Sequence, residues 1–223
     1  MSVLNLISAA RPCQEMAYKK SEQRKQQILD CAKHLFAQKG YQAAQISDIC
    51  EELKIARGTV YQYFENKENI FTTLIEQYFE NMNKALPETP VQSAFERGEM
   101  PDLTQIQNML TDYTHAFLLH MYRDRDLGRI IFLEGFTALP GIKDKLFEFF
   151  EDRKQRTVAG LRLGVALGVL RPMNADLIAS AMMGTTTRVI LDFILEGRVT
   201  SEDELRPMAE ELVAFQLRGV IAR

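Results

Sequence analysis

The segment RKQQILDCAKHLFAQKGYQAAQISDICEELKIARGTVYQYFENKENIF, residues 24–71, decides the fold of this 223-residue chain. Its first part places apolar residues at helical spacing, which builds one apolar stripe along a helix. Gly40 follows, where a helix end favours a residue that tolerates a positive φ. Residues 46–64 then form a short helix, a tight turn and a second short helix. This pattern predicts a helix-turn-helix, a motif that places its second helix in the major groove of DNA.

The second short helix presents polar side chains suited to base recognition. Arg57 can make a bidentate contact to guanine and Gln62 to adenine, and such pairs carry sequence specificity. Gly58 has no side chain, so the backbone could approach DNA closely. The alternative for Arg57 and Gln62 is a solvated helix face. For Tyr61 and Tyr63 the alternative is packing within the small domain. Because the motif fixes which face is outward, we expect contact with DNA.

The same segment resembles the DNA-binding domain of the tetracycline-repressor (TetR) family of bacterial regulators. The resemblance runs through Lys39-Gly40-Tyr41, Gly58-Thr59-Val60-Tyr61-Gln62-Tyr63-Phe64 and Lys67-Glu68, and these motifs cover about a quarter of the chain. It implies that Thr59, Tyr61 and Lys67 grip phosphates, which positions the domain without reading sequence. The DNA-binding residues that we expect are Lys20, Ser47, Arg57, Gly58, Thr59, Tyr61, Gln62, Tyr63 and Lys67.

Three residues depart from the family pattern. Gln45 stands where the family usually has Thr or Ser, so the preferred N-cap oxygen is missing. Lys54 replaces the usual turn glycine, and a non-glycine residue at positive φ costs about 1 kcal/mol. Ala56 replaces a serine before Arg57. These changes leave the fold intact but put family-derived phosphate contacts at 45 and 56 in doubt.

Lys20 belongs to a basic cluster at the start of the first helix, formed by Lys19, Lys20, Arg24 and Lys25. Such a cluster can lie along a phosphate backbone or enter the minor groove, and its alternative is ordinary solvated charge. The charge of the chain divides in the same sense. Residues 1–70 hold 10 Lys or Arg and 8 Asp or Glu, whereas residues 71–223 hold 17 and 22, within a formal net charge of −3. A mildly basic head on an acidic body suits a protein that touches DNA at one end.

Composition narrows the class of protein further. A hydrophobic fraction of 46% and a charged fraction of 26% are typical of an ordinary folded domain. Cys13, Cys31 and Cys50 form no Cys-x-x-Cys pair, so neither a disulfide framework nor a zinc finger is expected. The N-terminal residues lack a secretory pattern, and no apolar run approaches a membrane span. We therefore expect a cytoplasmic protein that has no contact with a membrane.

Helical spacing continues through the rest of the chain, and no stretch alternates for long enough to be a strand. We expect further helices at 67–86, 102–122, 126–137, 142–167, 174–196 and 201–222, with a loop at 88–101. The sequence thus predicts an all-α fold of about nine helices: a small three-helix DNA-binding head with the helix-turn-helix, and a larger helical ligand-binding and dimerisation domain. The expected parts are an N-terminal extension at 1–18, the helix-turn-helix domain at 19–66 and the larger domain at 67–223.

In the family that this chain resembles, the larger domain binds a small molecule and dimerises through its last two long helices. Ligand pockets are mostly apolar with a few placed polar groups. We expect pocket residues among Tyr113, Phe117, His120, Phe132, Glu134, Phe136 and Met183, although aromatic stripes at helical spacing are core by default. We expect dimer contacts among Met182, Thr186, Val189, Phe193, Leu205, Met208, Leu212 and Phe215, and these stripes can equally face their own core.

The leading hypothesis is a dimeric transcriptional regulator, a repressor that a small molecule releases from its operator. Its expected partners are double-stranded operator DNA, a second copy of the chain and a largely apolar effector, with no cofactor and no metal. We find no Gly-rich phosphate loop, nucleophile elbow or metal-spaced His/Glu cluster, so the sequence offers no catalytic residue. Two alternatives remain: a helical small-molecule-binding protein or enzyme with a vestigial helix-turn-helix, and a DNA-binding protein that needs no ligand.

Overall fold

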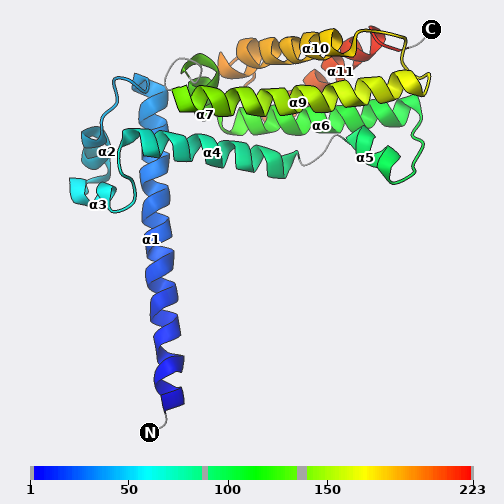
Figure 1. The fold of residues 1–223 in the computed structure, drawn as a ribbon. Helices are drawn as coiled ribbons and strands as arrows, with labels where there is room; N and C mark the ends of the chain where they lie inside the picture. The colour runs from blue at the N-terminus through cyan, green and yellow to red at the C-terminus, as the bar shows by residue number, and fades with distance from the viewer. Residues whose placement is uncertain (1–2, 87–89, 135–139, 222–223) are drawn as a thin grey trace. The chain divides into compact units, whose positions relative to one another are not determined.

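The computed structural model describes residues 3–86, 90–134 and 140–221, with side chains from residue 18 onward except at 90, 92, 96, 133–134 and 140–142. These residues are helical almost throughout and contain no strand, only an isolated bridge between Leu170 and Ile221 (Figure 1). The chain divides into two compact units, Met1–Ile75 (unit 1) and Glu76–Arg223 (unit 2). The predicted all-α class, with a helix-turn-helix head and a larger helical domain, is confirmed.

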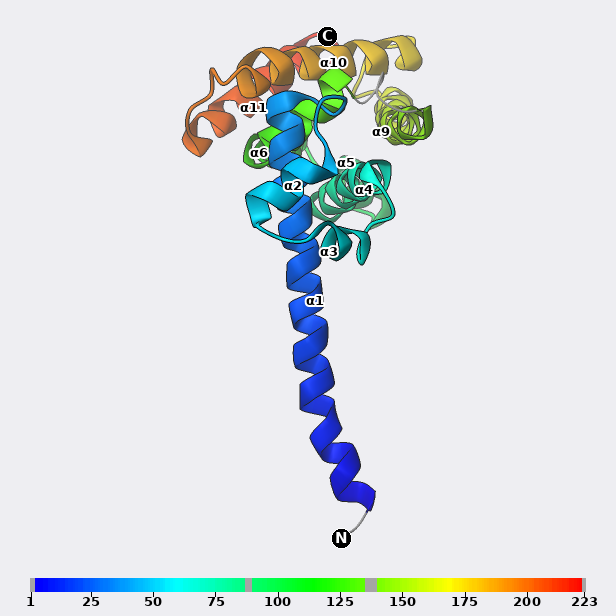
Figure 2. The same ribbon diagram turned by 90° about the vertical axis from the view of Figure 1, so that its left-hand side faces the viewer.

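Unit 1 holds α1 (Val3–Lys39), α2 (Ile46–Leu53), α3 (Arg57–Tyr61) and the first part of α4 (Lys67–Ala85). Residues 3–18, expected as an N-terminal extension, continue the helix of α1. The division between the units falls inside α4, later than the expected boundary after residue 66. In Figure 2 the short helices α2 and α3 lie beside the C-terminal part of α1.

The core of unit 1 is built around three aromatic rings from α1, the following turn and α4. Phe36 meets Tyr41 with ring centroids 5.5 Å apart and Phe71 at 5.6 Å, and Tyr41 lies 4.5 Å from Phe71. From the opposite side, Val60 and Phe64 are buried. Aromatic pairs at these separations stabilise a small core beyond the area they bury. This packing fixes α3 relative to α1 and α2.

The turn between α2 and α3 has the geometry that the sequence predicts. Lys54 has φ 53° and ψ 46°, and is the one non-glycine residue with positive φ in the described part of the chain. The missing cap at Gln45 is replaced by a later side chain: the Gln45 N–H donates to the Asp48 carboxylate at 2.9 Å. This hydrogen bond, aided by Lys39 at 3.5 Å, lowers the pKa of Asp48. The helix start is therefore capped from inside α2.

Unit 2 holds the end of α4 and a set of helices that pack in antiparallel pairs, with α11 against α6 and α10 against α9. Leu118 and Met121 on α6 and Leu205 and Ala209 on α11 are buried between them. The helices are α5 (Pro90–Glu96), α6 (Leu103–Arg123), α7 (Arg125–Arg129), η1 (Ile130–Glu134), α9 (Pro140–Ala166), α10 (Ala175–Val189), η2 (Ile190–Leu195), η3 (Glu202–Glu204) and α11 (Leu205–Arg218).

Two helices of unit 2 begin close to the predicted positions 102 and 174, and a side chain caps each of them. Asp102 accepts from the Gln105 N–H at 2.8 Å, and Asn174 accepts from the Leu177 N–H at 3.1 Å. The expectation of a continuous loop at 88–101 is wrong, because α5 forms within it and buries Ala94. Two π-helical turns, η1 and η2, also interrupt the regular spacing expected there.

The helix formed by α10 and η2, Ala175–Leu195, is the most apolar one in unit 2. The helix has 21 residues, and its most apolar 18-residue window has a mean hydropathy of 1.3. Only 17% of that window is buried. In length and composition it could cross a membrane, which the sequence analysis did not expect of any segment. It nevertheless carries ion pairs along its length, between Arg162 and Asp176 at 2.9 Å and between Arg188 and Asp192 at 2.6 Å.

Candidate nucleic-acid interface and ligand cavity

The helix-turn-helix exposes one face of α3. Val60 is fully buried and Phe64 nearly so, and both lie on the inner side of the motif. Arg57, Gly58 and Gln62 are exposed on the other side. A Cβ added at Gly58 would meet no heavy atom within 4 Å, so the surface there is open. The major groove of DNA admits an α-helix, so the polar side chains on this exposed face can reach base edges.

The remaining predicted DNA contacts differ in exposure. Tyr61 is 47% exposed, whereas Thr59 and Tyr63 are half-buried. The packing alternative therefore fits Tyr63 better than Tyr61. Lys20 is exposed on α1, and Ser47 is exposed on α2 with its hydroxyl 3.3 Å from Gln45 Oε1. Exposed lysine and hydroxyl groups of this kind are typical phosphate contacts.

Lys67 has a different environment from the one implied by the family resemblance. Its Nζ donates to the carbonyl oxygens of Tyr41 at 2.7 Å, Gln42 at 3.2 Å and Ala44 at 2.9 Å, and lies 4.4 Å from the centre of the Tyr41 ring. An ammonium group has three donors, so all of them are used. Partial burial lowers its pKa. We therefore correct the expectation: Lys67 ties the α1–α2 connection to α4 instead of offering its charge to a phosphate.

Unit 2 contains a mostly apolar cavity of about 290 Å³ that is partly open to solvent. One face of α9 runs along it, from Phe149 to Gly164, with Arg153 and Gly160 between them. This stretch of helix is about 22 Å long, so the cavity is elongated. Four of the predicted pocket residues line it: Tyr113, Phe117, Phe132 and Met183.

Of the other three predicted pocket residues, only His120 has a described side chain, and it does not line this cavity. His120 is half-buried beside Tyr78, with ring centroids 4.8 Å apart, and this partial burial lowers its pKa. Its ring packs on Tyr78 instead of facing the cavity wall that the described residues form. Glu134 and Phe136 fall outside the described side chains.

Arg153 is the residue of the cavity that the sequence analysis missed. It lies on α9 after Phe149 and Phe150, and its guanidinium donates to Tyr113 Oη at 2.6 Å, Asn83 Oδ1 at 2.6 Å and the Leu86 carbonyl at 3.2 Å. A basic residue on the apolar face of an amphipathic helix is the signal that could have revealed it. The neighbouring Arg156 also lines the cavity, but it pairs with Asp152 at 2.8 Å.

The predicted dimer residues separate into three groups by burial within one copy. Phe193 is 41% exposed and Phe215 is 66% exposed. Leu205 and Leu212 are buried, because this stripe of α11 packs against α6, so assigning them to a dimer surface is wrong. The others are half-buried: Met182, Thr186, Val189 and Met208. Among these, Met182 and Thr186 line the cavity, and both accept hydrogen bonds from Gln216 Nε2 at 3.2 Å.

Comparison with known proteins agrees with this geometry. Residues 28–74 match the family model described as bacterial regulatory proteins, tetR family. The chain is similar to the HTH-type transcriptional regulator HbdR of Aromatoleum sp. (strain CIB), with 25% identity over 70% of this chain and 64% of that protein. It is also similar to the fatty acid metabolism regulator protein of Bacillus subtilis (strain 168), with 38% identity over 28% of this chain and 34% of that protein. These matches span less than two thirds of either relative.

Among solved structures, the ketosteroid transcriptional regulator KstR2 of Mycobacterium tuberculosis has the same fold. The two superpose with a TM-score of 0.68 at 18% sequence identity, over 90% of this chain and 96% of that one.

Proposed function

We propose that this chain, whose DNA-binding segment belongs to the tetR family of bacterial regulatory proteins, is a ligand-responsive transcriptional regulator acting in the cytoplasm as a homodimer. The observation that carries the proposal is the open face of α3, where Arg57, Gly58 and Gln62 are exposed while Val60 and Phe64 anchor the helix. Arg and Gln at such positions recognise guanine and adenine. Phosphate contacts come from Lys20, Ser47, Thr59 and Tyr61.

The cavity of unit 2 supplies the ligand-responsive part of the proposal. It is mostly apolar, elongated and lined by helices, which are features of a small-molecule site. The Bacillus subtilis relative is named for fatty acid metabolism and the Mycobacterium tuberculosis structure for a ketosteroid. Both names point to largely apolar compounds, as does the wall of this cavity. The helix α4 begins in unit 1 and ends beside the cavity in unit 2, so a shift at its end can be transmitted to the head.

The experiment on DNA recognition uses the full chain and a duplex selected from a randomised library. We expect Arg57→Ala and Gln62→Ala each to relax preference at one base position by about 1–3 kcal/mol. Arg123→Ala is the matched control, because Arg123 is an exposed arginine of unit 2 that pairs with Glu202 at 2.8 Å. Binding to the selected and shuffled duplexes is measured by fluorescence anisotropy. If Arg57→Ala keeps full preference for the selected duplex, α3 does not read bases as proposed.

A further inference from the structure

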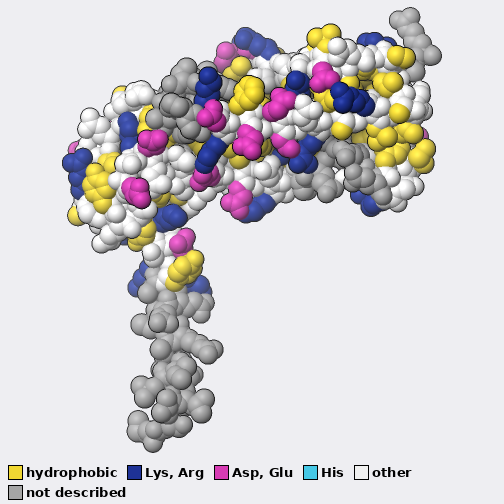
Figure 3. Space-filling view, viewed as in Figure 1, with side chains coloured by type: hydrophobic (Ala, Val, Ile, Leu, Met, Phe, Trp, Pro, Cys, Tyr) yellow, Lys and Arg dark blue, Asp and Glu magenta, His cyan; other side chains and the backbone are white. Residues whose placement is uncertain are grey.

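The cavity of unit 2 has mostly apolar walls and two arginines, Arg153 and Arg156, of which Arg156 is paired with Asp152. Its side walls are aliphatic and aromatic, and Gly160 leaves its backbone open to it, since a Cβ there would meet no heavy atom within 4 Å. Two residues that line the cavity, Leu103 at the start of α6 and Leu167 just after α9, are 49% and 41% exposed. Figure 3 shows hydrophobic side chains gathered over this end of unit 2, whereas charged side chains are more frequent over its middle. The cavity therefore opens to solvent between apolar side chains.

The Arg153 guanidinium in this cavity has only neutral partners. Its hydrogen bonds go to a phenol, an amide and a peptide carbonyl, and among the described residues no carboxylate lies within ion-pair distance of it. Its Nε is buried and has no acceptor at all. The Phe149 ring, 5.2 Å from Arg153 Cζ, adds a cation–π contact but no opposite charge. A partly buried cation without a counter-charge is costly, and an anion placed beside it recovers that cost.

The same guanidinium also holds the end of α4. Asn83 lies in the last turn of α4, and the Leu86 carbonyl follows directly after the helix ends at Ala85. Helix C-termini carry partial negative charge on unpaired carbonyls, which a cation stabilises. Arg153 therefore links the cavity to the helix that begins in unit 1.

We propose that the cavity binds an elongated apolar molecule with an oxyanion head group. This head group replaces Asn83 and Leu86 as hydrogen-bond acceptors of the Arg153 guanidinium. The head binds at Arg153 with the Tyr113 hydroxyl as a second donor, because Tyr113 Oη already accepts from Arg153 and keeps its own proton to donate. The tail runs along the α9 face past Gly160 toward Leu167. An oxyanion competes well with a neutral amide and a carbonyl, because hydrogen bonds between ions are the stronger ones.

The site and the switch are separate steps of this inference. Binding of the head group rests on the cavity alone. Release of the α4 end as a signal to DNA rests on the proposed function, and it follows because the ligand replaces the contacts of α4 with its own.

The test measures binding of three probes with the same tail to the full chain: dodecanoate, dodecyl phosphate and 1-dodecanol, by isothermal titration calorimetry without DNA. We expect at least one oxyanion to bind about 10–100-fold more tightly than the alcohol. Whether dodecanoate or dodecyl phosphate is preferred identifies the head group as carboxylate or phosphate. Equal binding of all three probes, or binding of the alcohol alone, would overturn the proposal.

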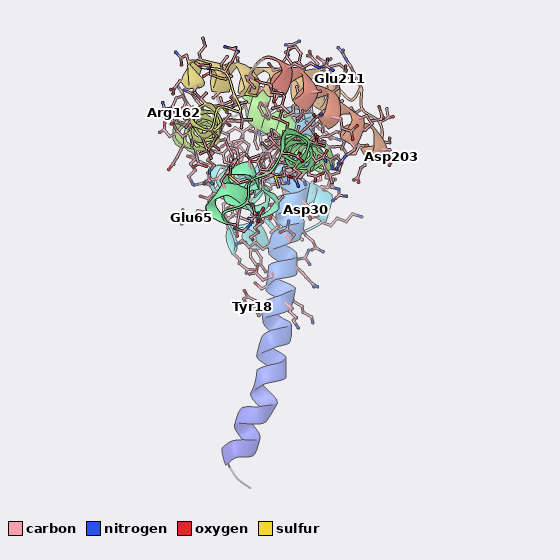
Figure 4. The ribbon with its side chains drawn as sticks, turned by 90° about the vertical axis from the view of Figure 1, so that its right-hand side faces the viewer. Tyr18, Asp30, Glu65, Arg162, Asp203 and Glu211 are labelled. Carbon is pink, nitrogen blue, oxygen red and sulfur yellow. The ribbon has the colours of Figure 1, made fainter. Side chains whose placement is uncertain are left out.

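Variants locate the head and the tail. Arg153→Met should reduce both oxyanions to the affinity of the alcohol, and Arg153→Lys should keep part of the preference because it keeps the charge. The matched control is Arg162→Met, which removes a guanidinium from the same helix outside the cavity wall; Figure 4 labels Arg162 on α9. Gly160→Leu should weaken all three probes alike by filling the cavity. An unchanged oxyanion preference in folded Arg153→Met protein rules the site out.

The switch is read by hydrogen exchange of the backbone amides at the end of α4. We expect Leu86 and its neighbours to exchange faster when the preferred oxyanion is bound, and not when the alcohol is bound. Unchanged exchange with a bound oxyanion overturns the α4 step. Because no DNA is present, failure of operator recognition leaves these results intact, and failure here leaves the DNA-binding proposal intact.

Discussion

At the scale of single residues, the two lysines at either side of the helix-turn-helix have different partners. Lys20 is an exposed side chain on α1, where its charge is available to a phosphate. Lys67 donates three hydrogen bonds to backbone carbonyls of the α1–α2 connection. Those carbonyls lie between two helices, where no helical N–H group donates to them. The Lys67 ammonium group supplies the missing hydrogen-bond donors.

This difference predicts opposite outcomes for two identical substitutions. Lys67→Ala should lower the free energy of unfolding of unit 1 by about 2 kcal/mol, because buried carbonyls lose a charged donor. Lys20→Ala should leave that stability within about 0.5 kcal/mol and reduce the salt dependence of DNA binding by about one phosphate contact. Urea denaturation followed by circular dichroism, and anisotropy titrations at several salt concentrations, measure the two effects. A stable Lys67→Ala protein with a reduced salt slope would restore the phosphate role.

At the scale of helices, α9 shows how one face of an element serves packing and a cavity at once. Gly160 and Gly164 are one turn apart on that face, yet their surroundings differ. A Cβ at Gly160 would meet nothing within 4 Å, whereas one at Gly164 would lie 2.6 Å from Leu170 Cδ1. The Leu170 side chain thus closes against the backbone of α9 only because position 164 has no side chain.

The pair Gly160→Ala and Gly164→Ala tests this division of the face. Alanine in a helix is favoured over glycine by about 1 kcal/mol, so Gly160→Ala should raise the stability of unit 2 by that amount. Gly164→Ala gains the same propensity but must displace Leu170, which costs about 1–3 kcal/mol, so no gain or a net loss is expected. Thermal unfolding of the two variants gives the comparison. Equal stabilisation by both would mean that Leu170 moves without cost.

The sequence predicts helices well because their caps and turns are local. Gln45 and Lys54 show the limit: the αL turn at Lys54 follows from its place in the motif, but the compensating cap by Asp48 becomes clear only with the geometry. The cavity shows a larger limit of prediction from the sequence. Arg153 and Asn83 are far apart in the chain, and their contact depends on how α4 and α9 pack. The hydrogen bonds of Lys67 could not be predicted for the same reason, because its carbonyl partners precede it by more than twenty residues.

At the scale of the whole molecule, unit 2 leaves apolar surface that a single copy does not cover. The helix Ala175–Leu195 is apolar but little buried, and Leu177, Phe193 and Phe215 are large exposed hydrophobic side chains. Exposed apolar patches of this kind mark interaction surfaces. A two-fold dimer of the kind proposed above would cover them with the same surface of a second copy.

Two substitutions on α11 separate the dimer surface from the core. Phe215→Glu should give folded monomers, because Phe215 is exposed in one copy, and these should bind operator poorly. Leu212→Glu should instead unfold unit 2, because it places a charge in the core between α11 and α6. Analytical ultracentrifugation and thermal unfolding distinguish the two outcomes. Dimers of unchanged affinity in the Phe215→Glu protein would place the interface elsewhere.

The aromatic wall of the cavity has an optical consequence. The chain contains no tryptophan, so its near-ultraviolet emission comes from its 7 tyrosines alone. Replacing Phe117 in the cavity wall with tryptophan would add a single fluorophore that can be excited at longer wavelengths, where tyrosine does not absorb. Its emission would report the polarity of the cavity directly, so occupancy could be followed in real time without labelling any ligand.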